Sequence, residues 1–315
     1  MLPVDEELRI RKNRITGGTG KKRVSIVTGI HGDELEGQYV CYLVNKIISE
    51  NPQHLNGTVD IYPAMNPLGI DSIERGIPGF DLDMNRIFPG SSDGSMTEYI
   101  AAGIIRDLEG SSLCFDIHAS NIYLTEMPQI RINELHKNGL LPYAGKANVD
   151  FVWVHGANTV LESTLAHTLN SRGVPTLVVE MGVGMRITKE LGAQLTRGIF
   201  SLMRHLGVWN GPVDDVRRPV ICHRDEEVIY FNSPVSGVFV KECEVGRWLK
   251  KGEIIGRIVD PLRGTLLADV TVPQDGLLFT TREYPIVCEG SLIGRMLKMS
   301  RKAYDASFKM REVQQ

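Results

Sequence analysis

The stretch VSIVTGIHGDELEG, residues 24–37, decides the fold class of this chain. Its apolar first part, Val24–Thr28, is typical of a buried strand, and the helical spacing of Leu35–Ile48 begins just after a glycine-rich turn. The turn places His31 and Glu34 three residues apart at a strand-to-helix corner. An imidazole nitrogen and a carboxylate exposed at such a corner can share one zinc ion.

The same His-x-x-Glu spacing occurs a second time, at His223 and Glu226. This pair lies in the charged segment HRDEE, without a glycine turn and without a strand or helix pattern beside it. Short motifs match by chance, so the context has to separate the two pairs. We interpret the second pair as part of a solvated surface run.

A third candidate ligand, His118, follows a second buried-strand pattern at Leu113–Ile117. Two histidines and one carboxylate from two strand ends leave a coordination position open for water, as a hydrolytic zinc site requires. The structural alternative for His118 is a histidine that is hydrogen-bonded at the end of its strand.

The segment ERGIPGFDLDMNRIFPG, residues 74–90, is too polar and too rich in glycine for a core element. Its adjacent Asn85 and Arg86 offer an amide and a planar guanidinium, which together can hold a carboxylate. We expect Asp83 to accept the free N–H of a ligating imidazole. The alternative is a solvated loop with an ordinary surface ion pair.

Glu180 ends an apolar strand pattern in PTLVVEMGVG, residues 175–184. A carboxylate at that position is costly unless it has a partner. Close to a zinc site it could take a proton from water and then protonate a leaving amine. An ion pair with a basic residue at the sheet edge is the structural alternative.

Taken together and in this order, the motifs resemble the zinc carboxypeptidase superfamily, and within it the succinylglutamate desuccinylase and aspartoacylase branch. The resemblance covers most of residues 20–210 and is carried by four motifs: His31-x-x-Glu34, Asp83-x-Asn85-Arg86, His118 in DIHAS, and Glu180 in VVEMG. It implies a mixed twisted sheet flanked by helices. It also implies one zinc ion per chain, bound by His31, Glu34 and His118.

The resemblance implies a role for each of the remaining residues. Arg75 would polarise the scissile carbonyl, Asn85 and Arg86 would hold the carboxylate of the substrate, and Glu180 would be the base. The reaction of this branch is hydrolysis of an amide next to a carboxylate, which releases an amino acid and a small carboxylic acid.

Strand and helix patterns alternate over the first two thirds of the chain, which indicates an α/β layer structure. The predicted strands are Val24–Thr28, Thr58–Ala64, Leu113–Ile117, Phe151–Val154 and Thr176–Glu180. The predicted helices are Leu35–Ile48, Met96–Glu109, Thr159–Ser171 and Thr188–Leu206. The candidate site residues fall at strand ends or in loops, where an open twisted sheet places its ligands.

After WNGPVDD the pattern changes to short apolar strands between glycine and proline turns, which predicts an all-β domain over residues 213–300 behind a catalytic domain over 1–212. The segments beginning at 233 and 271 repeat a Pro-x-x-Gly turn followed by two strands, so the two copies should interlock. This domain resembles the barrel-sandwich domains that carry biotin or lipoate. Residues 259–270, where a carrier presents its lysine, contain none, so we interpret the domain as structural. Residues 301–315 are predicted to be a solvated tail.

The composition agrees with a cytoplasmic enzyme of small-molecule substrates. The chain has 315 residues, of which 42% are hydrophobic, and a formal net charge of −3, which gives no case for binding nucleic acid or an anionic membrane. The charged N-terminus MLPVDEELRIRKNR is unlike a signal peptide, and five scattered cysteines do not indicate a disulfide framework. A homo-oligomer is compatible with the sequence.

Three functions follow from these predictions. The leading one is a zinc-dependent amidohydrolase that removes the acyl group of an N-acyl amino acid or a related small carboxylate. A zinc carboxypeptidase acting on small peptides would use the same metal and base with another pocket. A non-catalytic binding protein that keeps the fold should have lost Glu180 or a metal ligand, and this chain retains all of them.

Overall fold

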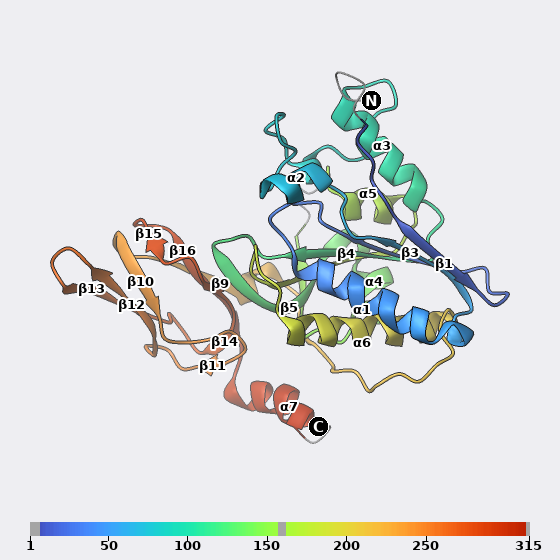
Figure 1. The fold of residues 1–315 in the computed structure, drawn as a ribbon. Coiled ribbons are helices and arrows are strands. Elements are labelled where there is room, and N and C mark those ends of the chain that lie inside the picture. Colours follow the sequence, from blue (N-terminus) through green and yellow to red (C-terminus); the bar gives the residue numbers. More distant parts are fainter. Residues whose placement is uncertain (1–6, 157–161, 313–315) are drawn as a thin grey trace.

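A computed structural model describes residues 7–156 and 162–312 of the chain. It shows a large α/β part and, at its edge, a second part made of strands (Figure 1). The strands of the α/β part are β1 Asn13–Gly17, β2 Arg23–Thr28, β3 Gly57–Tyr62, β4 Leu113–Ala119, β5 Leu124–Asn133, β6 Phe151–His155, β7 Thr176–Gly182 and β8 Val220–Cys222. Its α-helices are α1 Glu36–Glu50, α2 Pro67–Ser72, α3 Met96–Leu108, α4 Lys137–Ala144, α5 Leu165–Ser171 and α6 Lys189–Leu206.

The central strands of the large sheet run parallel in the order β3-β2-β4-β7. β1 joins β3 antiparallel at one edge, and β5 joins β7 antiparallel on the other side. Because β2 and β4 are neighbours and parallel, their carboxyl ends meet at the same edge of the sheet. His31 and His118 are therefore brought together by the topology, as predicted for a site at strand ends.

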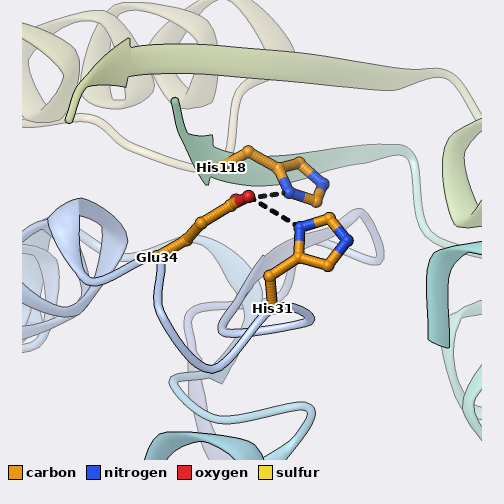
Figure 2. A group of neighbouring side chains, drawn as sticks. All are labelled: His31, Glu34 and His118. Carbon is orange, nitrogen blue, oxygen red and sulfur yellow. Dashed lines mark hydrogen bonds and ion pairs between the residues drawn. The ribbon is translucent and has the colours of Figure 1, made fainter. Parts of the chain in front are cut away.

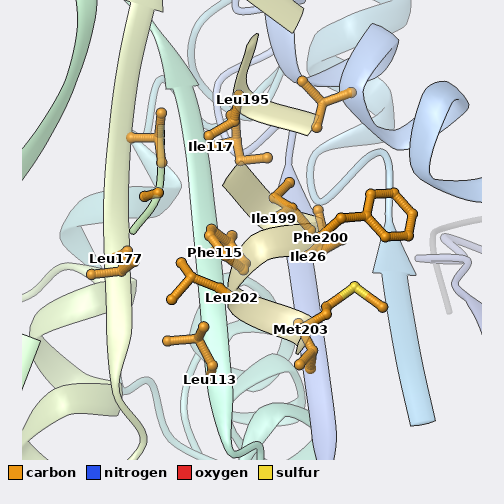
Figure 3. Packing of buried hydrophobic residues seen from close by; sticks show 14 of the residues in the cluster. Ile26, Leu113, Phe115, Ile117, Leu177, Leu195, Ile199, Phe200, Leu202 and Met203 are labelled. Carbon is orange, nitrogen blue, oxygen red and sulfur yellow. The ribbon is translucent and has the colours of Figure 1, made fainter. Parts of the chain in front are cut away.

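Helices cover both faces of this sheet, as the apolar runs of its central strands require. Alternate residues of β4, such as Phe115 and Ile117, pack with Ile26 of β2 against α1 and α6 (Figure 3). On the opposite face Val27 and Cys114 pack against α3 and α5. The sequence prediction of a mixed sheet flanked by helices is confirmed.

All five strands and four helices predicted for this part are present, with shifted ends. The largest shift concerns the helix predicted over Thr159–Ser171. It begins at Leu165, because Thr164 caps it by accepting a hydrogen bond from the N–H of His167, and Thr159 lies outside the described residues. β1, β5, α2 and α4 were not predicted.

The second part consists of β9 Val228–Asn232, β10 Gly237–Lys241, β11 Trp248–Leu249, β12 Ile254–Asp260, β13 Thr265–Thr271, β14 Gly276–Arg282, β15 Ile286–Val287 and β16 Leu292–Lys298. Its two similar halves interlock, as predicted: β15 of the second half pairs with β10, and β11 of the first half pairs with β14. β14 also pairs with β5, so the large sheet continues from the α/β part into this one. The domain boundary at residue 213 stays a prediction.

The residues after 300, which were predicted to be a solvated tail, include exposed positions such as Arg301 and Lys302 but also pack on one side. They form α7 Arg301–Glu312, and Tyr304 and Phe308, one helical turn apart, pack against an apolar cluster of the strand-rich part. The hydroxyl of Tyr304 also donates to the carbonyl of Gly246, 2.9 Å away. All five cysteines are free thiols, as expected. Within residues 7–156 and 162–312, no helix is both long and apolar enough to cross a bilayer, and the cytoplasmic location stays a prediction.

Candidate active site

The turn between β2 and α1 depends on two glycines. Gly29 has a φ of +69°, a conformation that L side chains rarely adopt. Gly32 lies against α2 so closely that a Cβ atom added to it would be 2.0 Å from the carbonyl carbon of Gly69. These two positions let the chain fold sharply beyond the strand, so that His31 and Glu34 both turn back over the sheet edge.

His31, Glu34 and His118 form one compact group in which the Glu34 carboxylate faces both imidazole rings (Figure 2). Nδ1 of His31 lies 2.8 Å from Oε1 of Glu34, and Nδ1 of His118 lies 2.9 Å from Oε2. One ligand atom from each residue lies within 4.8 Å of the others, and all three side chains are buried. Among the described residues this is the one group of three or more such side chains with metal-site spacing. His223 and Glu226, in contrast, are exposed, as predicted.

Each of the two histidines has a second carboxylate behind it. Nε2 of His31 lies 3.0 Å from Oδ1 of Asp83, and Nε2 of His118 lies 3.1 Å from Oδ1 of Asp116. Asp116 is 1% exposed, so its contact with His118 is shielded from solvent. Carboxylates in these positions orient imidazole rings that bind a metal through their other nitrogen.

The electrostatics of the group favour an ionised Glu34. Burial disfavours its charge, but the two imidazoles and their hydrogen bonds outweigh burial and lower the pKa of Glu34. Burial likewise disfavours the charged form of His118, yet Asp116 and Glu34 raise the pKa of His118 well above its usual value. Two imidazoles and one carboxylate in this arrangement are a donor set that fits zinc.

Arg75, Asn85 and Arg86 lie beside this group. Nη1 of Arg75 lies 2.8 Å from Oε1 of Glu34, and its Nη2 lies 3.4 Å from Asp83. Asn85 is buried, and its side-chain oxygen accepts from the N–H of Leu165 at 2.9 Å. Arg86 is exposed and donates to the backbone carbonyl of Asn85 at 2.8 Å. The 74–90 segment is thus fixed to α5 at the edge of the site.

Glu180 lies on β7 in register with His118 of the neighbouring β4. Its side chain is 14% exposed, and Oε1 lies 3.3 Å from Nη1 of Arg131. Burial raises the pKa of Glu180 to about 7, although the charge of Arg131 acts in the opposite direction. A carboxyl group with such a pKa can accept and return a proton near neutral pH.

The candidate residues surround a cavity of about 390 Å³. It is lined by every predicted site residue except Asp83, which reaches the site through its hydrogen bond to His31. His155, the last residue of β6, lines the same cavity.

Sequence reasoning missed four charged residues that line this cavity: Asp116, Glu126, Arg131 and Arg295. Asp116 had a usable signal, because its place two residues before His118 in one strand puts it on the same face. Glu126 and Arg131 lie on β5, whose sequence LTEMPQIRIN was not predicted as a strand. Arg295 comes from β16 and had no local signal.

The mixed α/β sheet, with a buried His-Glu-His group at one edge and a glutamate in register beside it, fits the class of amide-bond hydrolases. A family model described as the succinylglutamate desuccinylase/aspartoacylase catalytic domain matches residues 20–206. The chain therefore belongs to the succinylglutamate desuccinylase/aspartoacylase family and is a hydrolase that acts on amide bonds.

Individual relatives agree with this assignment. The chain is 27% identical over 283 residues to the N-alpha-acetyl-L-2,4-diaminobutyric acid deacetylase of Halomonas elongata, an alignment that covers 84% of this chain and 79% of that protein. The fold of the present chain is similar to that of a succinylglutamate desuccinylase/aspartoacylase from Rhodobacter sphaeroides. The TM-score is 0.76 and the identity 22%, over 93% of this chain and 90% of that one. The fold is also similar to that of the product-bound ectoine utilization protein EutE (DoeB) from Ruegeria pomeroyi, with a TM-score of 0.77 and 20% identity over 92% and 89% of the two chains.

Proposed function

We propose that this protein is a zinc-dependent amidohydrolase that removes the acyl group from an N-acyl amino acid or a related small carboxylate. The observation that carries the proposal is the convergence of His31, Glu34 and His118 with Glu180 in one cavity. The deacetylase from Halomonas elongata, whose name states an N-acetylated amino acid, supports this substrate class.

His31, Glu34 and His118 would hold the metal ion, which when bound activates water and polarises a carbonyl as a Lewis acid. Asp83 and Asp116 would keep the two imidazoles oriented toward it. His31 and His118 each face two carboxylates, one at each ring nitrogen. A histidine with a purely structural role does not need a second acidic partner, so this arrangement supports the metal role.

Glu180 would take a proton from the attacking water and pass it to the nitrogen of the leaving amine. Arg75, next to Glu34, would hydrogen-bond to the scissile carbonyl as it gains negative charge. Asn85 and Arg86 would bind the carboxylate of the substrate, the amide nitrogen and the guanidinium acting as donors. The products are a carboxylic acid and a free amine, which balance the atoms of one amide and one water.

The size of the cavity, about 390 Å³, favours a small substrate over an extended peptide. An N-acyl amino acid and a small peptide both meet this condition, so the deacylase is favoured over the carboxypeptidase by the N-acetylated substrate in the name of the Halomonas elongata relative.

The test is a panel of N-acetyl and N-succinyl amino acids, with dipeptides of the same C-terminal residues, assayed for released amine. We expect zinc-loaded protein to release amine from at least one N-acyl amino acid, and chelator-treated protein to lose and then regain this activity when zinc is restored. Activity that is confined to dipeptides would favour the carboxypeptidase. Activity that survives complete removal of the metal would contradict the proposal.

A further inference from the structure

Arg131 joins the buried carboxylate of Glu126 to the partly buried carboxylate of Glu180 through the two ends of its guanidinium group. Its Nη1 lies 3.3 Å from Oε1 of Glu180, while its Nη2 lies 2.9 and 2.8 Å from the two carboxylate oxygens of Glu126. The guanidinium also lies over the ring of Trp153, 5.7 Å from its centroid. A planar group that is held on two sides and one face has little freedom, so it fixes the direction from which it contacts Glu180.

Glu126 is in turn held from the strand-rich part of the molecule. Its Oε1 accepts from Nη1 of Arg295 at 2.7 Å and from the hydroxyl of Thr280 at 3.1 Å. Glu126 is 1% exposed. A buried carboxylate with two arginines and a hydroxyl around it has its charge compensated and its position determined by them. Arg295 therefore also decides how Arg131 is placed.

The residues of this network of ion pairs and hydrogen bonds come from four strands. Glu126 and Arg131 lie on β5, Glu180 on β7, Thr280 on β14 and Arg295 on β16, and β5 pairs with both β7 and β14. The strand-rich part thus contributes Arg295 to the lining of the cavity. This residue lies outside residues 20–206, the segment that the family model matches.

Resting on the function proposed above, we propose that Glu126 and Arg295 are positioning residues for Glu180, and that they act through Arg131. The strand-rich part then completes the active site from a distance, in addition to any structural role. A displacement of about 1 Å at a reacting group can cost on the order of 10²-fold in rate, so loss of this support should be visible in turnover.

The decisive experiment is a double-mutant cycle on the best substrate. Glu126→Gln, which keeps the shape but removes the charge, is expected to lower kcat by about 10–100-fold with KM within about twofold. In a Glu180→Gln background the same change should cost less than about twofold, because the group that it positions no longer works as a base. Equal losses in both backgrounds would overturn the proposal.

Arg295 is tested with Arg295→Met and the conservative Arg295→Lys. The methionine variant should lose kcat as Glu126→Gln does, and the lysine variant should recover most of it. The matched control is Arg257→Met, an exposed arginine on β12 that pairs with Glu242 and Asp269 and does not line the cavity. Loss of thermal stability with unchanged kcat in Arg295→Met would show a structural role only and would overturn the proposal.

A readout without turnover separates this inference from the proposed function. Crystal structures of wild type and Glu126→Gln should differ by about 1 Å or more at the Glu180 carboxylate. If wild type hydrolyses nothing in the panel, the proposed function fails, and these structures still decide the inference. A Glu180 side chain in the same place in both would overturn it.

Discussion

Asp83→Ala is expected to weaken metal binding without removing any ligand. Asp83 accepts from three partners: Nε2 of His31 at 3.0 Å, the N–H of Asn85 at 2.8 Å and Nη2 of Arg75 at 3.4 Å. Loss of a carboxylate behind a ligating imidazole typically costs about 10–100-fold in metal affinity. This corresponds to about 1.4–2.7 kcal/mol. Asp83→Asn keeps one acceptor oxygen and should lose less than Asp83→Ala.

The assay is competition for zinc against a chromogenic chelator, with circular dichroism to show that the fold is intact. Asp93→Ala is the matched control, because Asp93 is an exposed aspartate in the same connection between β3 and α3. It should bind zinc as wild type does. An Asp83→Ala protein with wild-type affinity, or an equal loss in the control, would refute the reasoning about Asp83.

The remaining predictions concern pH, substrate binding and the glycine turn. Glu180 works as a base only in its carboxylate form, so kcat/KM should rise with pH as Glu180 loses its proton. Burial raises the pKa of Glu180 to about 7 and a bound cation would lower it, so the midpoint should lie at or below about 7. A kcat/KM that falls with pH over this range would contradict the role. Wild type should prefer a substrate with a free carboxylate over the corresponding carboxamide by about 1.5–3 kcal/mol, calculated from the ratio of the kcat/KM values, and Arg86→Ala should abolish this preference. An unchanged preference would exclude Arg86 from substrate binding. In denaturant unfolding, Gly32→Ala should lower the free energy of unfolding by about 1–3 kcal/mol, because its Cβ would lie 2.0 Å from the Gly69 carbonyl carbon. Gly103→Ala on α3, with open space around it, should raise the free energy of unfolding by about 0.5–1 kcal/mol. Equal stabilities of the two variants would contradict the close approach.

Short-range patterns were sufficient for the central parallel strands of the α/β part and for the residues at their ends. The runs of β2, β4 and β7 are mostly apolar, with Ser25 in β2 and Asp116 in β4 as polar exceptions. Each run leads to a candidate site residue at or just beyond its end, namely His31, His118 and Glu180. Parallel strand ends meet at one sheet edge whatever lies between them in sequence. The grouping of these side chains could therefore be predicted before their distances were known.

What could not be predicted depends on pairing between distant segments. β5 contains Pro128 and a register shift between Glu126 and Gln129, so its alternation is broken. The contact of Glu126 with Arg295 spans 169 residues and exists only because β14 joins β5. α7 was missed because its two aromatic residues face a surface that other segments build. None of these signals is local.

The most direct test of the central claim compares wild type and Glu180→Gln for bound zinc and for turnover of the best N-acyl amino acid. Because glutamine is nearly isosteric and neutral, the variant should retain one zinc ion per chain and bind substrate. Its turnover should fall by about 10²–10⁴-fold, the range for a lost acid-base group. A Glu180→Gln protein with intact zinc and near-normal turnover would contradict the account.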